Sequence, residues 1–280
     1  RGDAASAGFC GMPALPVLAR AALHVGEEPC ISGTHGSGTV FFSGCSMRCR
    51  FCQNAPISHG QYGAAVSVER LAEIFQELEG QGAHNINLVN PTHYAAAIRQ
   101  ALRLYRPKIP VVYNSSGYER VETLRSLEGL IDVYLPDCKY VHSDLAASLS
   151  GTPDYFAAAG PAILEMARQT GPITLDGEGL AARGTMVRHL VLPGCVDNSL
   201  GVLDWFSEHF HGKGVWFSLM SQYVPMGRAK NMPPFDRHIT ENEYAAVCSY
   251  LELCDIENGY TQDFSSAIQD YIPKFDLSGL

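Results

Sequence analysis

The sequence predicts an α/β protein with a parallel sheet covered by helices. Three observations predict this class: apolar β-type runs alternate with helical patterns, the strand-like runs are apolar almost throughout, and 46% of the 280 residues are hydrophobic. Strands in a parallel sheet read as continuous apolar runs because helices bury both of their faces. The length fits one α/β barrel domain, but periodicity alone does not distinguish a barrel from an open sheet.

Six strand-like runs are rich in β-branched and aromatic residues and end at turn-forming residues. In chain order they cover 39–44, 84–90, 109–116, 131–137, 185–193 and 215–222. No repeat beyond this βα alternation and no linker interrupts the series. We therefore predict one domain over 39–280 with a C-terminal extension. An irregular lead-in over 1–38, rich in Gly, Ala and Pro, precedes it.

Helical patterns separate these strands and follow the last one. They cover 67–80, 93–105, 154–169, 198–210 and 240–254. In the first, apolar residues recur on one helical face, although Arg70 stands where a capping box would have Glu. The segment 154–169 is predicted to break near Gly160-Pro161, because proline lacks the N–H that a helix interior needs. Residues 223–239 carry several Pro and Gly residues and are predicted to form a long functional loop, such as a lid or crossing segment.

The charge and the cysteine count narrow the class of function. The formal net charge is −9 and no run of Lys or Arg occurs, so neither nucleic acid nor an anionic membrane is an expected partner. No apolar stretch approaches the ~18 residues of a membrane span. Nine cysteines, an odd number with one tight cluster, form no dense disulfide framework. We therefore expect a cytoplasmic protein with a metal site.

The tight cluster lies in FFSGCSMRCRFCQN, where Cys45, Cys49 and Cys52 follow a predicted strand. A cubane iron–sulfur cluster is usually held by four thiolates, so three would leave one iron open for a substrate or cofactor. Two alternatives remain at this point. One is a structural zinc site with His59 as the fourth ligand, and the other is three buried thiols that bind nothing.

The spacing C-x-x-x-C-x-x-C, with Phe51 before the last cysteine, resembles the signature of the radical S-adenosylmethionine (SAM) superfamily. Within it, GSGTVFFSGC followed by CQN resembles the pyruvate formate-lyase activating enzyme group. Poorly characterised relatives of that group are more similar still, through EEPCISGTHGSGTVFFSGC, NINLVNPTHY, SLMSQYVP and DYIPKFDLSG. The resemblance extends from about residue 26 to the C-terminus.

This resemblance implies a partial (β/α)6 barrel of the TIM type, with a radical SAM core of parallel strands. It implies one [4Fe–4S] cluster on Cys45, Cys49 and Cys52, with SAM chelating the open iron. One electron, from a partner such as flavodoxin or ferredoxin, would cleave SAM to a 5′-deoxyadenosyl radical that abstracts a substrate hydrogen atom.

The resemblance also implies that SAM contacts lie at the ends of the strands. The expected contacts are Phe51, Asn90, Asn114, Ser116, Lys139, Arg188 and Gln222. Two positions depart from the group's pattern. The stretch at Asn90 replaces a Gly-Gly-Glu-like stretch, and Asn114 replaces an acid, which puts a bound monovalent cation in doubt. The alternative for each residue is a strand-end polar group without a ligand.

Two further cysteines, Cys138 and Cys195, follow predicted strands and are expected to face the same site. A thiol can donate a hydrogen atom to a carbon radical, so an epimerase-like reaction on a small molecule such as a sugar is the first hypothesis. The alternative for both is core packing. A second hypothesis is activation of a glycyl radical on a partner protein, and a third is a zinc-stapled binding module. Cys10 and Cys30 could belong to a second metal site.

Overall fold

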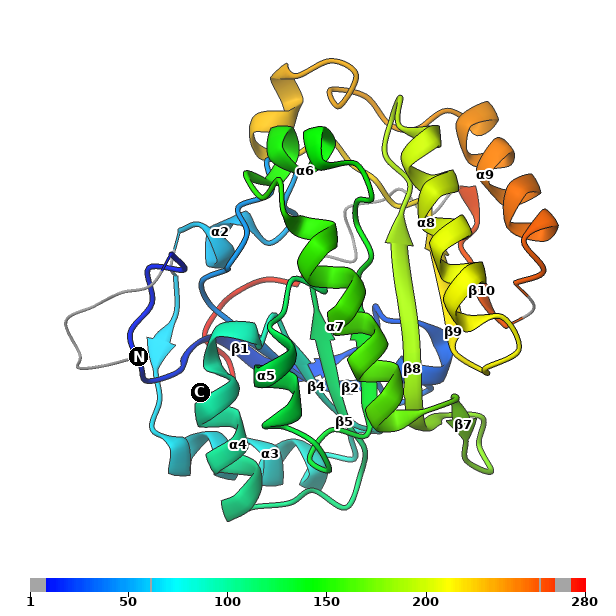
Figure 1. Ribbon diagram of the computed structural model, residues 1–280. Helices are drawn as coiled ribbons and strands as arrows, with labels where there is room; N and C mark the ends of the chain where they lie inside the picture. Colours follow the sequence, from blue (N-terminus) through cyan, green and yellow to red (C-terminus); the bar gives the residue numbers. More distant parts are fainter. Residues whose placement is uncertain (1–8, 61, 257, 265–272) are drawn as a thin grey trace.

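The structure is a computed structural model that describes residues 9–60, 62–256, 258–264 and 273–280. Its strands form one mostly parallel sheet flanked by helices (Figure 1), in the order β10-β9-β8-β6-β5-β4-β2-β1-β3, with β7 beside β8. β10 and β3, at the two ends of this order, do not pair with each other within the described residues. The predicted α/β class and the partial barrel are confirmed.

The strands have the following bounds. They are β1 (Val17–His24), β2 (Ser37–Phe42), β3 (Ala64–Ala65), β4 (Ile86–Val89), β5 (Val111–Ser115), β6 (Val133–Pro136), β7 (Thr174–Leu175), β8 (Ala181–Leu190), β9 (Trp216–Met220) and β10 (Gly259–Thr261). The six predicted strands overlap β2, β4, β5, β6, β8 and β9, and neighbours in that series pair in parallel. Their carboxyl ends therefore meet at one end of the barrel.

Most of the helices connect these strands and cover the outside of the sheet (Figure 1). They are α1 (Pro29–Ser32), α2 (Ala55–Ser58), α3 (Val68–Gly80), α4 (Ala95–Leu104), α5 (Val121–Arg125), α6 (Ser143–Ser150), α7 (Tyr155–Thr170), α8 (Val196–Phe210) and α9 (Glu241–Leu253), with 3-10 turns η1 (Thr92–Tyr94) and η2 (Gly227–Asn231). The described helices include none that is long and apolar enough to cross a bilayer.

The start of α3 follows its sequence signal, whereas α7 continues through a residue that usually ends a helix. Ser67 caps α3 by accepting a hydrogen bond from the Arg70 N–H, although the second half of a capping box is missing. The predicted break in α7 is wrong, because the helix continues through Pro161. Buried Gly160 lies against Trp205, and burial of this face offsets the one helical hydrogen bond that proline removes.

The predicted irregular lead-in is wrong from Val17 onward. β1 pairs antiparallel with β2, from Leu18 opposite Phe42 to His24 opposite Ser37. Its sequence VLARAALH is rich in helix-forming Ala, Leu and Arg, so the strand depends on pairing with its neighbour rather than on local propensity. A boundary at residue 38 therefore runs through one sheet.

The segment after β1 fills one end of the barrel interior. Cys30 and Ile31 of α1 pack with Val112 and Val133, whose neighbours along the strands face the outer helices. Cys10 belongs to a different apolar cluster, on the outer side of the sheet. Cys10 and Cys30 thus lie in different parts of the core.

Candidate active site

One cavity of about 260 Å³ opens at the carboxyl ends of the parallel strands. Ten of the twelve residues proposed above for the site line it. They are Cys45, Cys49, Phe51, Cys52, Asn90, Asn114, Ser116, Lys139, Arg188 and Gln222. These residues lie at the carboxyl-terminal parts of six different strands or on the loops that follow them, and they meet because those strands run parallel.

The three cysteines lie on the loop between β2 and α2, and each sulfur has a polar neighbour. The Met47 N–H donates to Cys45 Sγ over 3.3 Å, and the Ser150 hydroxyl donates to Cys49 Sγ over 3.0 Å. The Ser58 hydroxyl lies 3.2 Å from Cys52 Sγ. Such contacts stabilise thiolates and tune the potential of an iron–sulfur cluster.

Burial and mutual repulsion make this a poor place for bare thiolates. Burial, together with the neighbouring Cys49 and Cys52, raises the pKa of Cys45 to about 12. Burial and Cys49 raise the pKa of Cys52 to about 11. Binding of a cation to the sulfurs would reverse this and release protons. Soft thiolate ligands of this kind suit an iron–sulfur cluster, so the residues present fit the group.

No three His, Cys, Asp or Glu side chains in the described residues are arranged to hold a single metal ion. The thiolates of a multi-iron cluster bind different irons, so their spacing differs from that around one ion. His59, the fourth ligand of the zinc alternative, ends α2 and is not among the residues that line the cavity.

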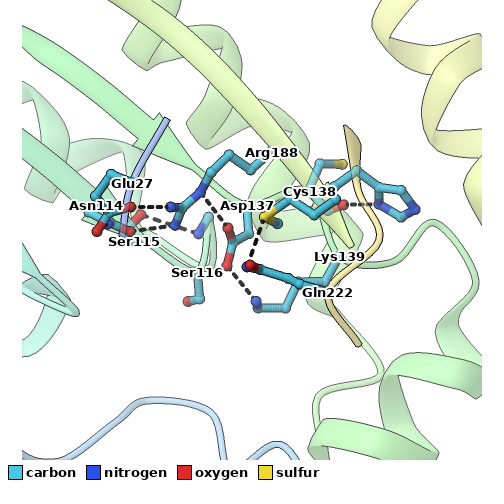
Figure 2. Close-up of polar contacts among 12 residues, drawn as sticks. Glu27, Asn114, Ser115, Ser116, Asp137, Cys138, Lys139, Arg188 and Gln222 are labelled. Carbon is cyan, nitrogen blue, oxygen red and sulfur yellow. Dashed lines mark hydrogen bonds and ion pairs between the residues drawn. The ribbon is translucent and has the colours of Figure 1, made fainter. Parts of the chain in front are cut away.

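A buried ion network crosses the cavity (Figure 2). Arg188 of β8 donates through Nη1 to Glu27 Oε2 over 3.0 Å and through Nε to Asp137 Oδ1 over 3.1 Å. Its third contact is with the Asn114 amide oxygen, and the Asn114 amide nitrogen donates to Glu27 over 3.2 Å. Arg188 and Asn114, both expected to contact SAM, are thus bound to protein groups in this structure.

Lys139 is bound to the same network through Asp137, to which its ammonium group donates a hydrogen bond. Burial opposes ionisation of Asp137, but the Lys139 and Arg188 charges keep its pKa below the usual range. The Tyr155 hydroxyl of α7 joins this loop to its neighbour by donating to the main-chain oxygens of Ser116 and Asp137 over 2.7 and 2.8 Å.

The close approach of these loops requires a glycine. A Cβ atom at Gly117, where φ is +75°, would lie 2.3 Å from the Asp137 main-chain oxygen. The Gly at this position therefore allows Ser116 and Asp137 to stand side by side at the cavity wall.

Two polar groups at the cavity have atoms available to a ligand. Asn90 directly follows β4 with φ of +58°, an uncommon conformation for a residue other than glycine. Its amide nitrogen donates to the Gly44 main-chain oxygen, which leaves the amide oxygen as an acceptor for an ammonium group. Ser116 Oγ is buried and has no hydrogen-bond partner in the described structure. A ligand in the cavity would satisfy it.

The expectation that Cys138 and Cys195 face the site is wrong. Neither is among the residues that line the cavity. Cys138 is fully buried in the core between the sheet and the helices, and burial raises its pKa to about 12. Cys195 precedes α8 and packs against the edge of the same apolar cluster. A role as hydrogen donor stays a prediction for both.

Sequence reasoning missed Glu27 and Asp137 as site residues. Asp137 stands beside Lys139, so an acid–base pair after a strand was a usable signal. Glu27 belongs to Glu27-Glu28-Pro29, an acidic pair inside an apolar stretch. Glu27 reaches Arg188 because it follows β1, and the sequence of β1 does not predict a strand.

Comparisons with known proteins agree with this geometry. The family described as a 4Fe-4S single cluster domain matches residues 31–152. An uncharacterised protein of Methanocaldococcus jannaschii is 30% identical over 246 residues, which cover 84% of this chain and 66% of that protein. The chain thus spans somewhat less than two thirds of that relative's length.

Two solved structures share the fold at low sequence identity. SuiB of Streptococcus suis has a TM-score of 0.50 and 14% identity, covering 82% of this chain and 50% of SuiB. HydG, a maturase of the [FeFe]-hydrogenase, has a TM-score of 0.50 and 14% identity, covering 78% of this chain and 48% of HydG. This chain has the fold of the radical SAM superfamily, and its match to a 4Fe-4S single cluster domain spans Cys45, Cys49 and Cys52. The cofactors typical of that superfamily are a [4Fe–4S] cluster and SAM.

Proposed function

We propose that this enzyme abstracts a hydrogen atom from a small molecule bound in the cavity beside the three cysteines. One observation supports the proposal most directly: Cys45, Cys49 and Cys52 line the same cavity as the polar groups at the strand ends. Apolar Phe51 and Met220 line this cavity together with a few polar groups, and such a mixture is typical of sites for small molecules.

The residues divide the work as follows. Cys45, Cys49 and Cys52 would hold the cluster, and Asn90 and Ser116 would receive the head of SAM. When bound there and reduced by one electron, the cluster and SAM would together supply the radical chemistry that removes the hydrogen atom. Asp137 holds the Lys139 ammonium group at the cavity wall, where it can face an anionic group of either ligand.

The first test is the ligand assignment. After anaerobic reconstitution we expect about four irons per chain and an iron–sulfur absorption spectrum. Cys45→Ala should lose both, together with reductive SAM cleavage, whereas Cys248→Ala on α9 should keep all three. Zinc in place of iron in the purified protein, or unchanged SAM cleavage by Cys45→Ala, would reject the proposal.

The second test concerns the fate of the substrate radical. With candidate sugars and other small molecules in deuterated water, a deuteron on carbon in the product would support an epimerase-like reaction. Loss of that deuteron in Cys138→Ala or Cys195→Ala would support the hydrogen-donor role predicted for that thiol, and its retention in both variants would reject that role. A stable glycyl radical on a partner protein, seen by electron spin resonance, would instead favour activation of that partner.

A further inference from the structure

Two segments far apart in the sequence touch on the outer side of the cluster loop. The Ala229 N–H of η2 donates to the Arg50 main-chain oxygen over 3.2 Å, and Arg50 Nη1 lies 3.3 Å from Met232 Sδ. The contact requires Gly227, whose φ is +53°, because a Cβ atom there would lie 2.9 Å from the same oxygen. In Figure 1 η2 is the gold turn near α6.

These segments bring together four exposed cations, which we term the basic rim: Arg48, Arg50, Arg228 and Lys230. None of them forms an ion pair with a carboxylate in the described part of the chain. Arg48 and Arg228 act on a common neighbour: burial lowers the pKa of His59, and the charges of these two arginines lower it further. Arg48 and Arg228, 180 positions apart in the sequence, thus contribute to one local positive potential.

The rim contrasts with the rest of the molecule. The chain has a formal net charge of −9, yet 45–54 and 223–239 together hold five Lys or Arg residues and one Asp. Many exposed arginines elsewhere are paired with acids, as Arg106 is with Asp132 and Arg168 with Glu128. A positive patch on an acidic protein attracts and orients an acidic partner, while the remaining surface repels it.

The position of the rim indicates what that partner carries. Arg48 and Arg50 flank Cys49, so a protein docked on the rim lies directly over a cluster ligand. We propose that the basic rim is the docking surface for an acidic one-electron donor protein of the flavodoxin type. This inference rests on the proposed function, because only a cluster at Cys49 would need that electron.

The test compares two donors under anaerobic conditions. Stopped-flow absorption would follow cluster reduction by reduced flavodoxin and, in parallel, by photoreduced deazariboflavin, a small uncharged donor that needs no docking surface. For the wild type, reduction by flavodoxin should slow as salt is added, and reduction by deazariboflavin should not. Charge reversal by R228E/K230E should slow the flavodoxin reaction about tenfold at low salt and flatten its salt dependence.

A matched control is R103E/K213E. Arg103 lies in the last turn of α4 and Lys213 follows α8, at the end of the barrel opposite the rim, and both are exposed. This variant should behave as the wild type. Dividing each flavodoxin rate by the deazariboflavin rate of the same protein corrects for any loss of cluster, and Arg48→Gln provides a second variant outside η2.

The outcomes separate the two proposals. Equal normalised rates for R228E/K230E and R103E/K213E would overturn the docking surface, and so would a wild-type flavodoxin rate that does not depend on salt. R228E/K230E could instead lose a reaction on a partner protein while its flavodoxin rate stays unchanged. The rim would then be the docking surface for an acidic protein substrate, and the proposed docking of an electron donor would be overturned. No reduction of the wild type by either donor would reject the proposed function itself.

Discussion

The cations inside the barrel and those on the basic rim differ in their partners. Arg188 and Lys139 lie at the cavity wall and bind Glu27 and Asp137, with side-chain exposures of 13% for Arg188, 12% for Glu27 and 16% for Asp137. The rim cations are exposed and lie on turns where the structure describes no carboxylate within ion-pair distance. Positively charged side chains are thus paired and largely buried at the cavity wall, but exposed and without an ion-pair partner on the described part of the rim.

The difference follows from the cost of removing a charge from water. An unpaired charge in the interior costs several kcal/mol, so interior cations hold fixed positions with fixed partners. An exposed cation keeps its hydration and costs little alone. The interior set can therefore position the walls of a site, whereas the exposed set remains available to another molecule.

Removing an interior cation should have the largest effect. Arg188→Met leaves Glu27 and Asp137 buried without their shared counter-ion, and we expect a loss of about 3–5 kcal/mol in the free energy of unfolding. Denaturant titration would measure it. Lys213→Met, which removes an exposed cation, should change that free energy by less than about 0.5 kcal/mol. A loss below about 1 kcal/mol for Arg188→Met would contradict the claim that the buried carboxylates depend on this interior cation.

The second prediction concerns Glu119, a buried carboxyl group for which the described residues offer no ion-pair partner. Glu119 accepts a hydrogen bond from the Thr92 hydroxyl over 2.6 Å, and burial raises its pKa to about 7 from 4.5. The protonated form is therefore favoured in the folded state. Its contribution to stability is fully present below pH 4.5 and is lost as the pH rises through 7.

Glu119→Gln replaces this group with one that does not ionise. The variant should match the wild type in unfolding free energy near pH 5 and exceed it by roughly 3 kcal/mol above pH 8. Thermal or denaturant unfolding at the two pH values would measure the difference. A constant offset across this range would show that Glu119 does not titrate there.

The smallest effect on stability is expected at the rim. R228Q/K230Q should change the unfolding free energy by less than about 0.5 kcal/mol, because neither side chain has an ion-pair partner in the described structure. Substitution of Gly227 by Ala should cost more, about 1–3 kcal/mol, since the new Cβ strains the contact with Arg50. The reverse order of these two effects would show that the rim cations have a structural role.

The sequence revealed most of the site because most of its residues belong to short motifs at or after the strands. The cysteine spacing identified three residues of the cavity, and the family resemblance built on that spacing implied seven more. The sequence did not reveal which of their atoms are free. Arg188 and Asn114 read as ligand contacts, yet both are bound to Glu27, a residue contributed by a segment without a strand signature.

The sequence by itself determined the α/β class, the thiolate cluster and the order of the strands along the chain, because each depends on residues within a few positions of one another. Only the tertiary structure decided that β1 joins the sheet, that Cys138 and Cys195 turn away from the cavity, and that Arg50 meets η2. Those outcomes depend on pairing and burial between segments far apart in the chain, and such contacts leave no periodic trace in the residues that make them.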